Sequence, residues 1–303
     1  MSDRPRLVML GTLLVAGTAL LATLYQAKLS TPMRSTLTSS FQILGVPLKL
    51  VDRAASRVLP VDELDEKSLG DVYRKSYDPQ TVPPSREQRY LDSLVEELSP
   101  FAARDFPYRV YVVDYPTPNA MALPGGIVLV TRELLSTLKS ENELFAVLAH
   151  EIGHIELGHC FDAVRFELLS RKLGAESLGQ IADMSAQLLL RHSYSKTMEH
   201  EADEYAFELL TNSRYDPRGV GHAFDSLEAY LETRGGRMPM HAIPLRDYFS
   251  SHPPLPVRAD EFTQRADAWW RRHRDERRYV GRKNLSARVS LVSHPLDAEW
   301  TGP

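Results

Sequence analysis

Cysteine is almost absent from this chain of 303 residues, since Cys160 is the only one. A single thiol forms no disulfide within the chain and offers no pair of thiolates to a metal ion. Neither sign of charge dominates, because the formal net charge is −4, whereas proteins that bind nucleic acid usually carry a basic surface. No internal repeat of solenoid period is found. These absences argue against a disulfide scaffold and a nucleic-acid partner, and they leave one sizeable domain with extensions.

Long apolar runs are equally scarce, and the clearest one is residues 7–25. This run carries no charge and follows Arg4 and Arg6. Its length just spans a bilayer. A cleaved signal peptide is disfavoured because bulky side chains lie three residues before the candidate cleavage sites, and a buried core helix is a further alternative. We predict that residues 1–27 are a transmembrane signal anchor, which places the rest of the chain outside the cytoplasm, on the periplasmic side in a bacterium.

The sequence His150-Glu151-Ile152-Gly153-His154 carries the clearest chemistry of the chain. Residues four apart share one face of a helix, so His150 and His154 can bind the same ion. Glu151 can then hold and deprotonate a water molecule on that ion. This is the H-E-x-x-H arrangement of zinc hydrolases, and it predicts one Zn²⁺ per chain.

The residues before this motif predict a buried helix. Residues 143–149 are strong helix formers and mostly apolar, and Ser140 followed by Glu143 fits a capping box. Buried imidazoles need polar partners, because an unsatisfied buried polar group costs free energy. A metal ion would satisfy them, and the alternative is a pair of core histidines bonded to the backbone.

A third ligand is expected on a second helix, where Glu199 and Asp203 lie four residues apart. Glu199 can take the metal, while Asp203 accepts the outer N–H of a metal-bound histidine. Glu201 points about 160° away from this pair and is the weaker choice. On a continuing helix His159 lies about half a turn from His150, which favours a structural or supporting role over metal binding. A solvated acidic face is the alternative for the carboxylates.

Four motifs, taken in their order along the chain, resemble those of peptidase family M48, a family of zinc metalloproteases. The resemblance covers about residues 86–265. Besides the histidine motif, it rests on residues 195–203 (S-K-x-x-E-x-E-A-D), residues 119–126 (N-A-x-A-x-P-G-G) and His252-Pro253-Pro254 with Arg258 six residues after the histidine. Lys196 is a mild departure, since the family usually has arginine there.

The resemblance implies an α+β, mainly helical fold, a zincin-type (gluzincin) metallopeptidase domain with a small sheet. It implies that His150, His154 and Glu199 bind zinc and that Glu151 assists attack of the zinc-bound water on a peptide bond. His252 or Arg258 would then stabilise the oxyanion, or His252 would cap the zinc in a resting state. A structural turn at a helix N-terminus is the alternative for the His252 segment.

A strand and a hairpin predict how a substrate binds. Residues 108–113 are β-branched and aromatic, and residues 119–131 fit a short hairpin around Pro124-Gly125-Gly126. An unpaired edge formed by Asn119, Ala120, Met121, Ala122 and Leu123 could bind an extended polypeptide by strand addition. This mode predicts loose specificity for unfolded or flexible segments, and a purely structural hairpin is the alternative.

The predicted organisation has four parts. These are a signal anchor (1–27), a tether with short helices (28–85), the zinc metallopeptidase domain (86–270) and a basic C-terminal extension (271–303). The predicted function is cleavage of unfolded or flexible membrane and envelope proteins, a form of quality control. The alternatives are a non-catalytic zinc-containing holdase and a scaffold for envelope proteins.

Overall fold

The computed structural model describes residues 62–78, 83–172, 177–191, 194–234 and 255–302. The predicted anchor over residues 1–27 and the candidate catalytic residue His252 lie outside the described residues. Within the described ranges, no helix combines the length and the apolar character needed to cross a bilayer.

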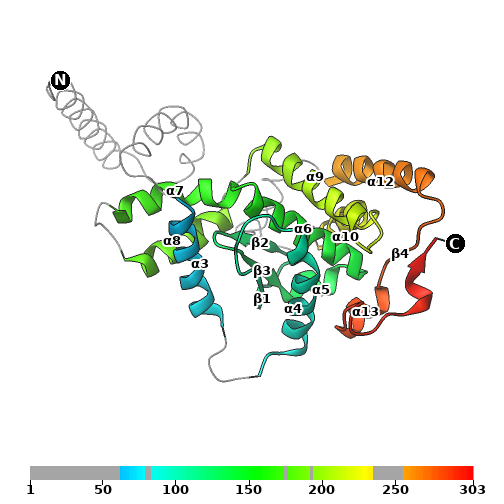
Figure 1. Cartoon of the computed structure of the whole chain (residues 1–303), viewed down its shortest axis with the longest axis horizontal. Coiled ribbons are helices and arrows are strands. Elements are labelled where there is room, and N and C mark those ends of the chain that lie inside the picture. The colour runs from blue at the N-terminus through cyan, green and yellow to red at the C-terminus, as the bar shows by residue number, and fades with distance from the viewer. Residues whose placement is uncertain (1–61, 79–82, 173–176, 192–193, 235–254, 303) are drawn as a thin grey trace, which may run out of the picture. The chain divides into compact units, whose positions relative to one another are not determined.

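A three-stranded sheet accompanies a majority of helices (Figure 1). Its strands are β1 (Arg109–Val113), β2 (Ala120–Leu123) and β3 (Ile127–Thr131), in the order β1-β3-β2. β1 runs parallel to β3, and β2 runs antiparallel to it. The predicted mainly helical fold with a small sheet is confirmed, and so is the predicted hairpin, whose strand β2 lies at the edge of this sheet.

Helix α6 (Glu141–Glu156) carries the histidine motif and is buried along almost its whole length. It packs against β2, α9 (Lys196–Asn212) and α10 (Gly219–Arg234). A helix that is apolar all round belongs in the interior, which explains the apolar run before the motif. The packing brings both the edge strand and the second predicted ligand helix to the histidine motif.

The N-terminus of α6 begins after Ser140, as predicted, but the predicted capping box is wrong. The Ser140 hydroxyl donates to Glu143 Oε1 at 2.9 Å instead of accepting a helix N–H. The first N–H groups of a helix need acceptors. In α6 these acceptors come from a segment more than a hundred residues away in the sequence.

This distant segment is the C-terminal part of the chain, which includes a two-stranded sheet of β4 (Arg278–Tyr279) and β5 (Trp300–Thr301). The N–H of Glu141 donates to the Gly281 carbonyl at 3.1 Å, and the next N–H donates to the Val280 carbonyl at 3.0 Å. Gly281 has φ +75°, and a Cβ there would lie 2.7 Å from the Cβ of Glu141. Only glycine therefore allows this close approach.

Helix α3 (Glu63–Tyr77) holds the β2–β3 turn. A Cβ on Gly70 would lie 2.6 Å from the Gly125 carbonyl oxygen, so the helix and the turn are almost in backbone contact. The carboxylate of Glu66 is buried there and pairs with Arg104 at 2.5 Å. This helix lies within the predicted tether with short helices (28–85), and its apolar face and its buried carboxylate pack against the folded domain.

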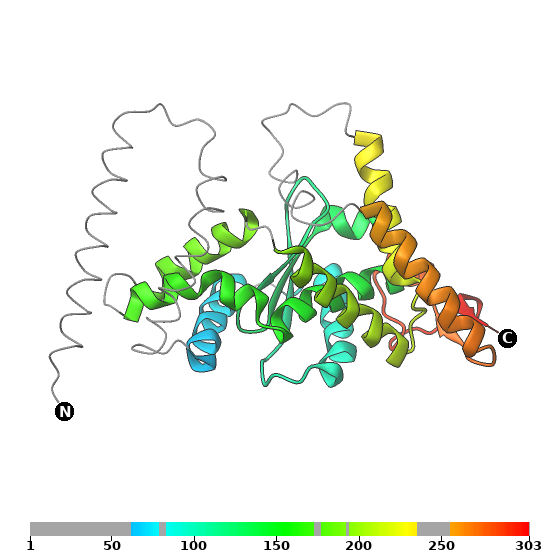
Figure 2. The same ribbon diagram turned by 90° about the horizontal axis from the view of Figure 1, so that it is seen from above.

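The remaining elements complete the framework. Helix α4 begins after the N-cap Ser85, and helices α7 and α8 pack on each other (Figures 1 and 2). The further elements are α4 (Arg86–Leu98), η1 (Ser99–Phe101), α5 (Arg132–Thr137), α7 (His159–Lys172), α8 (Leu178–Arg191), α12 (Leu255–Arg272), α13 (Arg282–Ala287) and η2 (Asp297–Glu299).

Glu141, the first residue of α6, has a fully buried carboxyl group. The Leu291 N–H and the Tyr215 hydroxyl donate to its Oε1 at 2.8 and 2.9 Å. Burial raises the pKa of Glu141 to about 7, although hydrogen bonds from Leu291, Tyr90 and Tyr215 oppose the shift. The buried carboxyl therefore links the N-terminus of α6 to the C-terminal segment in a pH-dependent way.

Glu141→Gln should make the stability of the fold less dependent on pH. A carboxyl whose pKa rises from 4.5 to about 7 on folding stabilises the fold below about pH 4.5, and this contribution is lost as the pH rises through about 7. The loss amounts to about 3 kcal/mol. Urea unfolding at pH 5 and pH 8 should show the variant gaining stability relative to wild type at the higher pH. An equal difference at both pH values would contradict the assignment.

Candidate active site

Helices α6 and α9 bring His150, His154 and Glu199 together in the interior. The two histidine Nε2 atoms lie 3.2 Å apart. Glu199 places one carboxylate oxygen 3.6 Å from His150 Nε2 and the other 3.4 Å from His154 Nε2. The three side chains are buried, with exposed fractions of 8%, 1% and 0%.

These distances fit a tetrahedral zinc ion. Zinc binds imidazole nitrogen and carboxylate oxygen at about 2.0–2.2 Å, so neighbouring ligand atoms of a tetrahedral site lie about 3.3 Å apart. The histidine nitrogens lie 3.2 Å apart, and each faces a different Glu199 oxygen, at 3.6 and 3.4 Å, so the three side chains are close enough to share one ion. His150, His154 and Glu199 would hold the ion and leave a fourth position open.

A second group within the described ranges also has metal-ligand spacing, and it consists of His200, Glu204 and Glu261. It lies on the surface, and the Glu204 carboxylate forms a two-pronged ion pair with the guanidinium of Arg265. Exposed acidic groups of this kind are usually solvated. The buried group is therefore the candidate zinc site.

Asp203, one turn after Glu199 on α9, contacts the outer nitrogen of His150. Its Oδ1 lies 2.9 Å from His150 Nδ1. Burial lowers the pKa of His150, but the hydrogen bond and charge of Asp203, together with the charge of Glu199, raise it above its usual value. Burial raises the pKa of Asp203, but His150 and Arg258 bring it below its usual value. The pair is placed as a carboxylate that supports a metal-bound histidine.

Arg258 of α12 contacts the carboxylates instead of pointing into open space. Its Nε and Nη2 donate to the two Asp203 oxygens at 2.8 and 2.5 Å, and Nη2 lies 3.5 Å from Glu199. The guanidinium stacks over the Phe224 ring, 4.3 Å from its centroid. These contacts support a role in orienting Asp203 and Glu199, and donation to an oxyanion stays a prediction.

Glu151 points from α6 towards the edge strand, where its Oε2 accepts the Ala122 N–H at 2.8 Å. The Thr131 N–H donates to the Asn119 carbonyl at 2.9 Å. Antiparallel pairing alternates along a strand, so Met121 and Leu123 direct their backbone groups to β3. The backbone groups of Ala120 and Ala122 face the opposite side, which is the side of Glu151.

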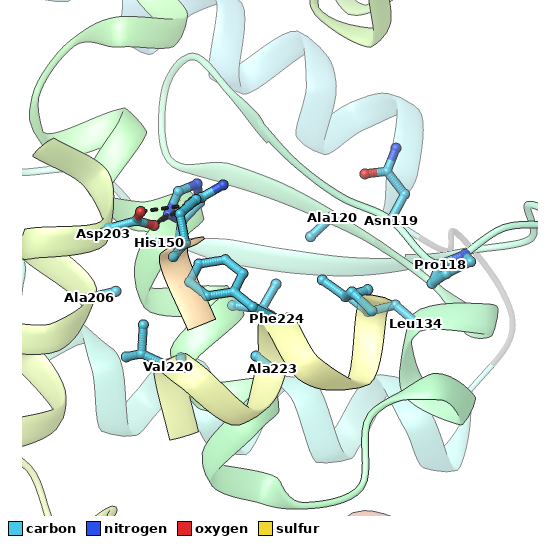
Figure 3. Close-up of a pocket in the computed structure, with 14 residues that line it drawn as sticks. Pro118, Asn119, Ala120, Leu134, His150, Asp203, Ala206, Val220, Ala223 and Phe224 are labelled. Atoms are coloured by element: carbon cyan, nitrogen blue, oxygen red, sulfur yellow. Dashed lines mark hydrogen bonds and ion pairs between the residues drawn. The ribbon is translucent and has the colours of Figure 1, made fainter. Parts of the chain in front are cut away.

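A small, mostly apolar pocket lies beside His150. Figure 3 shows Phe224 of α10 and Leu134 of α5 facing the same space as Ala120 of β2, with Asp203 directed at His150. Most of the wall is aliphatic or aromatic, and it also includes Pro118, Asn119, Ala146, Val147, Ala206, Val220, Ala223, Leu227 and Arg258. The predicted strand residues Asn119 and Ala120 thus line the same pocket as His150.

His159, predicted to have a structural or supporting role, lies at the start of α7 beside His154. Helix α6 ends at Glu156, and Gly158 with φ +76° redirects the chain. His159 Nδ1 then lies 3.0 Å from His154 Nδ1, and His159 Nε2 lies 3.2 Å from Glu201 Oε2. The helical period correctly directs Glu201 away from the Glu199–Asp203 face, but it does not predict the contact of Glu201 with His159. The sequence feature that indicates it is Gly158, because a glycine at this position allows the chain to reverse after α6.

Glu199→Gln should remove most of the bound zinc, because an amide is a much weaker zinc ligand than a carboxylate. The loss of zinc affinity should exceed the roughly 10–100-fold effect of removing an outer partner of a ligand. Zinc per chain after dialysis, measured by atomic absorption, tests this. Glu208→Gln on the exposed face of the same helix is the matched control. Full zinc occupancy in Glu199→Gln would contradict the ligand assignment.

Comparison with known proteins identifies the same family that the four sequence motifs resemble. The model of peptidase family M48 matches residues 85–266, which is more than half of the chain. The mitochondrial metalloendopeptidase OMA1 of Arabidopsis thaliana is 32% identical over 150 residues, covering 48% of this chain and 29% of the relative. OMA1 of Schizosaccharomyces pombe is 31% identical over 166 residues, covering 53% of this chain and 48% of the relative.

A bacterial relative is similar to the same extent. The metalloprotease LoiP of Escherichia coli is 29% identical over 171 residues, covering 53% of this chain and 63% of the relative. The chain thus spans less than two thirds of the length of each of these relatives. Since the family model spans the histidine motif, Glu199 and Arg258 in one continuous match, the chain belongs to peptidase family M48.

Proposed function

We propose that this protein is a zinc-dependent endopeptidase. The observation that carries the proposal is the close, buried grouping of the His150, His154 and Glu199 ligand atoms, all within 4.8 Å of one another, beside Glu151. Relatives named metalloendopeptidase and metalloprotease support the same activity.

The chemistry divides between the ion and the chain. His150, His154 and Glu199 would hold a zinc ion, which would act as a Lewis acid and make water a nucleophile near neutral pH. Glu151 takes the proton of the attacking water and later returns it to the leaving amine. The Ala122 N–H holds the Glu151 carboxylate at 2.8 Å and so keeps the base at the strand edge where the peptide carbonyl would lie.

The substrate binds as an extended strand along β2. The support for this is that β2 lies at the edge of its sheet and that the backbone groups of Ala120 and Ala122 face away from β3. Strand addition uses backbone hydrogen bonds and reads little sequence. Unfolded or flexible polypeptide segments are therefore the proposed substrate class.

The apolar pocket supplies the side-chain selectivity that strand addition lacks. It borders His150 and Ala120, so a side chain close to the scissile bond would enter it. Its wall is mostly aliphatic and aromatic, which favours an apolar substrate side chain. The pocket residue Val147 precedes His150 by three positions on α6 and is well placed to limit the size of that side chain.

The proposed location is a membrane. The uncharged residues 7–25 support a transmembrane anchor, and the folded part would then lie outside the cytoplasm. Anchoring would keep the protease near unfolded membrane and envelope proteins, which makes quality control of such proteins the proposed role.

Glu151→Gln should keep zinc and lose cleavage of an unfolded protein such as casein. Glutamine can still accept the Ala122 N–H, but it cannot take a proton from water, and general-base catalysis contributes about 10²–10⁴-fold. Zinc content and cleavage rate are measured on the same preparation. Undiminished cleavage would rule out the mechanism. A wild-type protein that binds zinc and prevents aggregation without ever cutting would favour the non-catalytic holdase instead.

Val147→Phe should shrink the pocket and change which peptides are cut. We expect kcat/KM for peptides with a large apolar residue at the pocket to fall about 10–200-fold, the usual effect of a few buried carbon atoms. Peptides with alanine there should be affected much less. Val147→Ala is the matched variant and should shift selectivity towards larger side chains. An identical fall for all peptides would contradict the pocket assignment.

A further inference from the structure

We propose that His159 and Glu201 form a supporting pair that fixes the orientation and the tautomer of the zinc ligand His154. The proposal rests on the zinc site described above. It assigns a positioning role to two residues that do not touch the ion.

The two nitrogens of His154 face different partners. Its Nε2 lies within the ligand cluster, 3.2 Å from His150 Nε2 and 3.4 Å from Glu199 Oε1. Its Nδ1 points out of the cluster and lies 3.0 Å from His159 Nδ1. A metal-bound imidazole needs its outer nitrogen bonded, because that bond sets the ring orientation and tautomer.

The contacts define one consistent arrangement of protons. If His154 binds zinc through Nε2, its Nδ1 carries the hydrogen and donates it. His159 Nδ1 must then be the acceptor, so the hydrogen of neutral His159 lies on Nε2. This Nε2 faces the carboxylate of Glu201 at 3.2 Å. Glu201 thereby selects the tautomer of His159, and His159 selects that of His154.

Burial increases the effect of these hydrogen bonds on the orientation of the His154 ring. His154 and His159 have exposed fractions of 1% and 5%, so water is largely excluded as a substitute partner. Tyr194 stacks on the His154 ring, with centroids 4.1 Å apart and an interplanar angle of 21°. Hydrogen bonding at the edge and stacking on the face together leave the ring one orientation.

The same helix therefore supplies three carboxylates with separate tasks. On α9, Glu199 faces the ligand nitrogens, Asp203 contacts the outer nitrogen of His150, and Glu201 contacts His159. Gly158 makes the third contact reachable, because its φ of +76° ends the turn after α6 and lets α7 begin beside α9. A side chain at this φ would be strained.

The two histidine ligands differ in the charge of the groups that contact their outer nitrogens. His150 is supported directly by the carboxylate of Asp203, which Arg258 holds with two hydrogen bonds. His154 is supported through a second imidazole, and the carboxylate behind it is half exposed, at 51% of its side chain. Loss of the His159–Glu201 pair should therefore loosen His154 without disturbing the His150 side of the site.

Zinc affinity of the full chain tests the proposal, measured by competition with a chromogenic chelator. His159→Phe keeps the size of the ring and removes the acceptor, so affinity should fall about 10–100-fold. His159→Gln restores an acceptor carbonyl and should recover part of the loss. Glu201→Ala removes the acceptor that faces His159 Nε2 and should weaken binding in the same direction, and Glu208→Ala, an exposed change on α9, should match wild type.

Two further measurements separate positioning from folding. The zinc-free variants should melt like the zinc-free wild type, and the absorption spectrum of cobalt-loaded His159→Phe should differ from that of wild type, because the ligand geometry changes. Wild-type affinity in His159→Phe would overturn the proposal. Should that variant not fold, wild-type affinity in Glu201→Ala would overturn it. Failure of the wild-type chain to bind zinc would instead refute the proposed function.

Discussion

The structure depends on keeping two buried imidazoles and a buried carboxylate satisfied. His150, His154 and Glu199 are all buried, and unsatisfied polar groups in such a place cost free energy. A zinc ion would satisfy the inner atoms, while the outer nitrogens meet Asp203 and His159. These outer partners are themselves paired, since Asp203 accepts a hydrogen bond from the Arg258 guanidinium and His159 contacts the Glu201 carboxylate.

The helix that carries the histidines is held by parts of the chain outside the family match at residues 85–266. The carbonyls of Val280 and Gly281 accept its first N–H groups, and α3 braces the turn that leads into the edge strand through the contact of Gly70 with Gly125. Both attachments act at a distance from the ligands. They fix the two elements, α6 and β2, whose relative position sets the separation between Glu151 and a bound strand.

The local elements of the fold and the site could be predicted from the sequence, whereas the long-range contacts could not. The HExxH helix, its start after Ser140 and the hairpin around Gly125 and Gly126 follow from local rules of period, capping and turn chemistry. The pairing of Glu199 with Asp203 follows from the same helical period. The packing of α3 on the folded domain could not be predicted, because local polarity hides a buried carboxylate whose partner, Arg104, lies far along the chain.

The sequence by itself determined which side chains share a helix face, and hence the pair His150 and His154 and the pair Glu199 and Asp203. Only the tertiary structure decided that α6 and α9 lie close enough for one ion, that Glu201 meets His159, and that a distant segment caps α6. The reason is physical: helical period acts over four residues, whereas these contacts depend on how buried faces pack and on a reversal at Gly158 whose direction depends on the neighbouring helices.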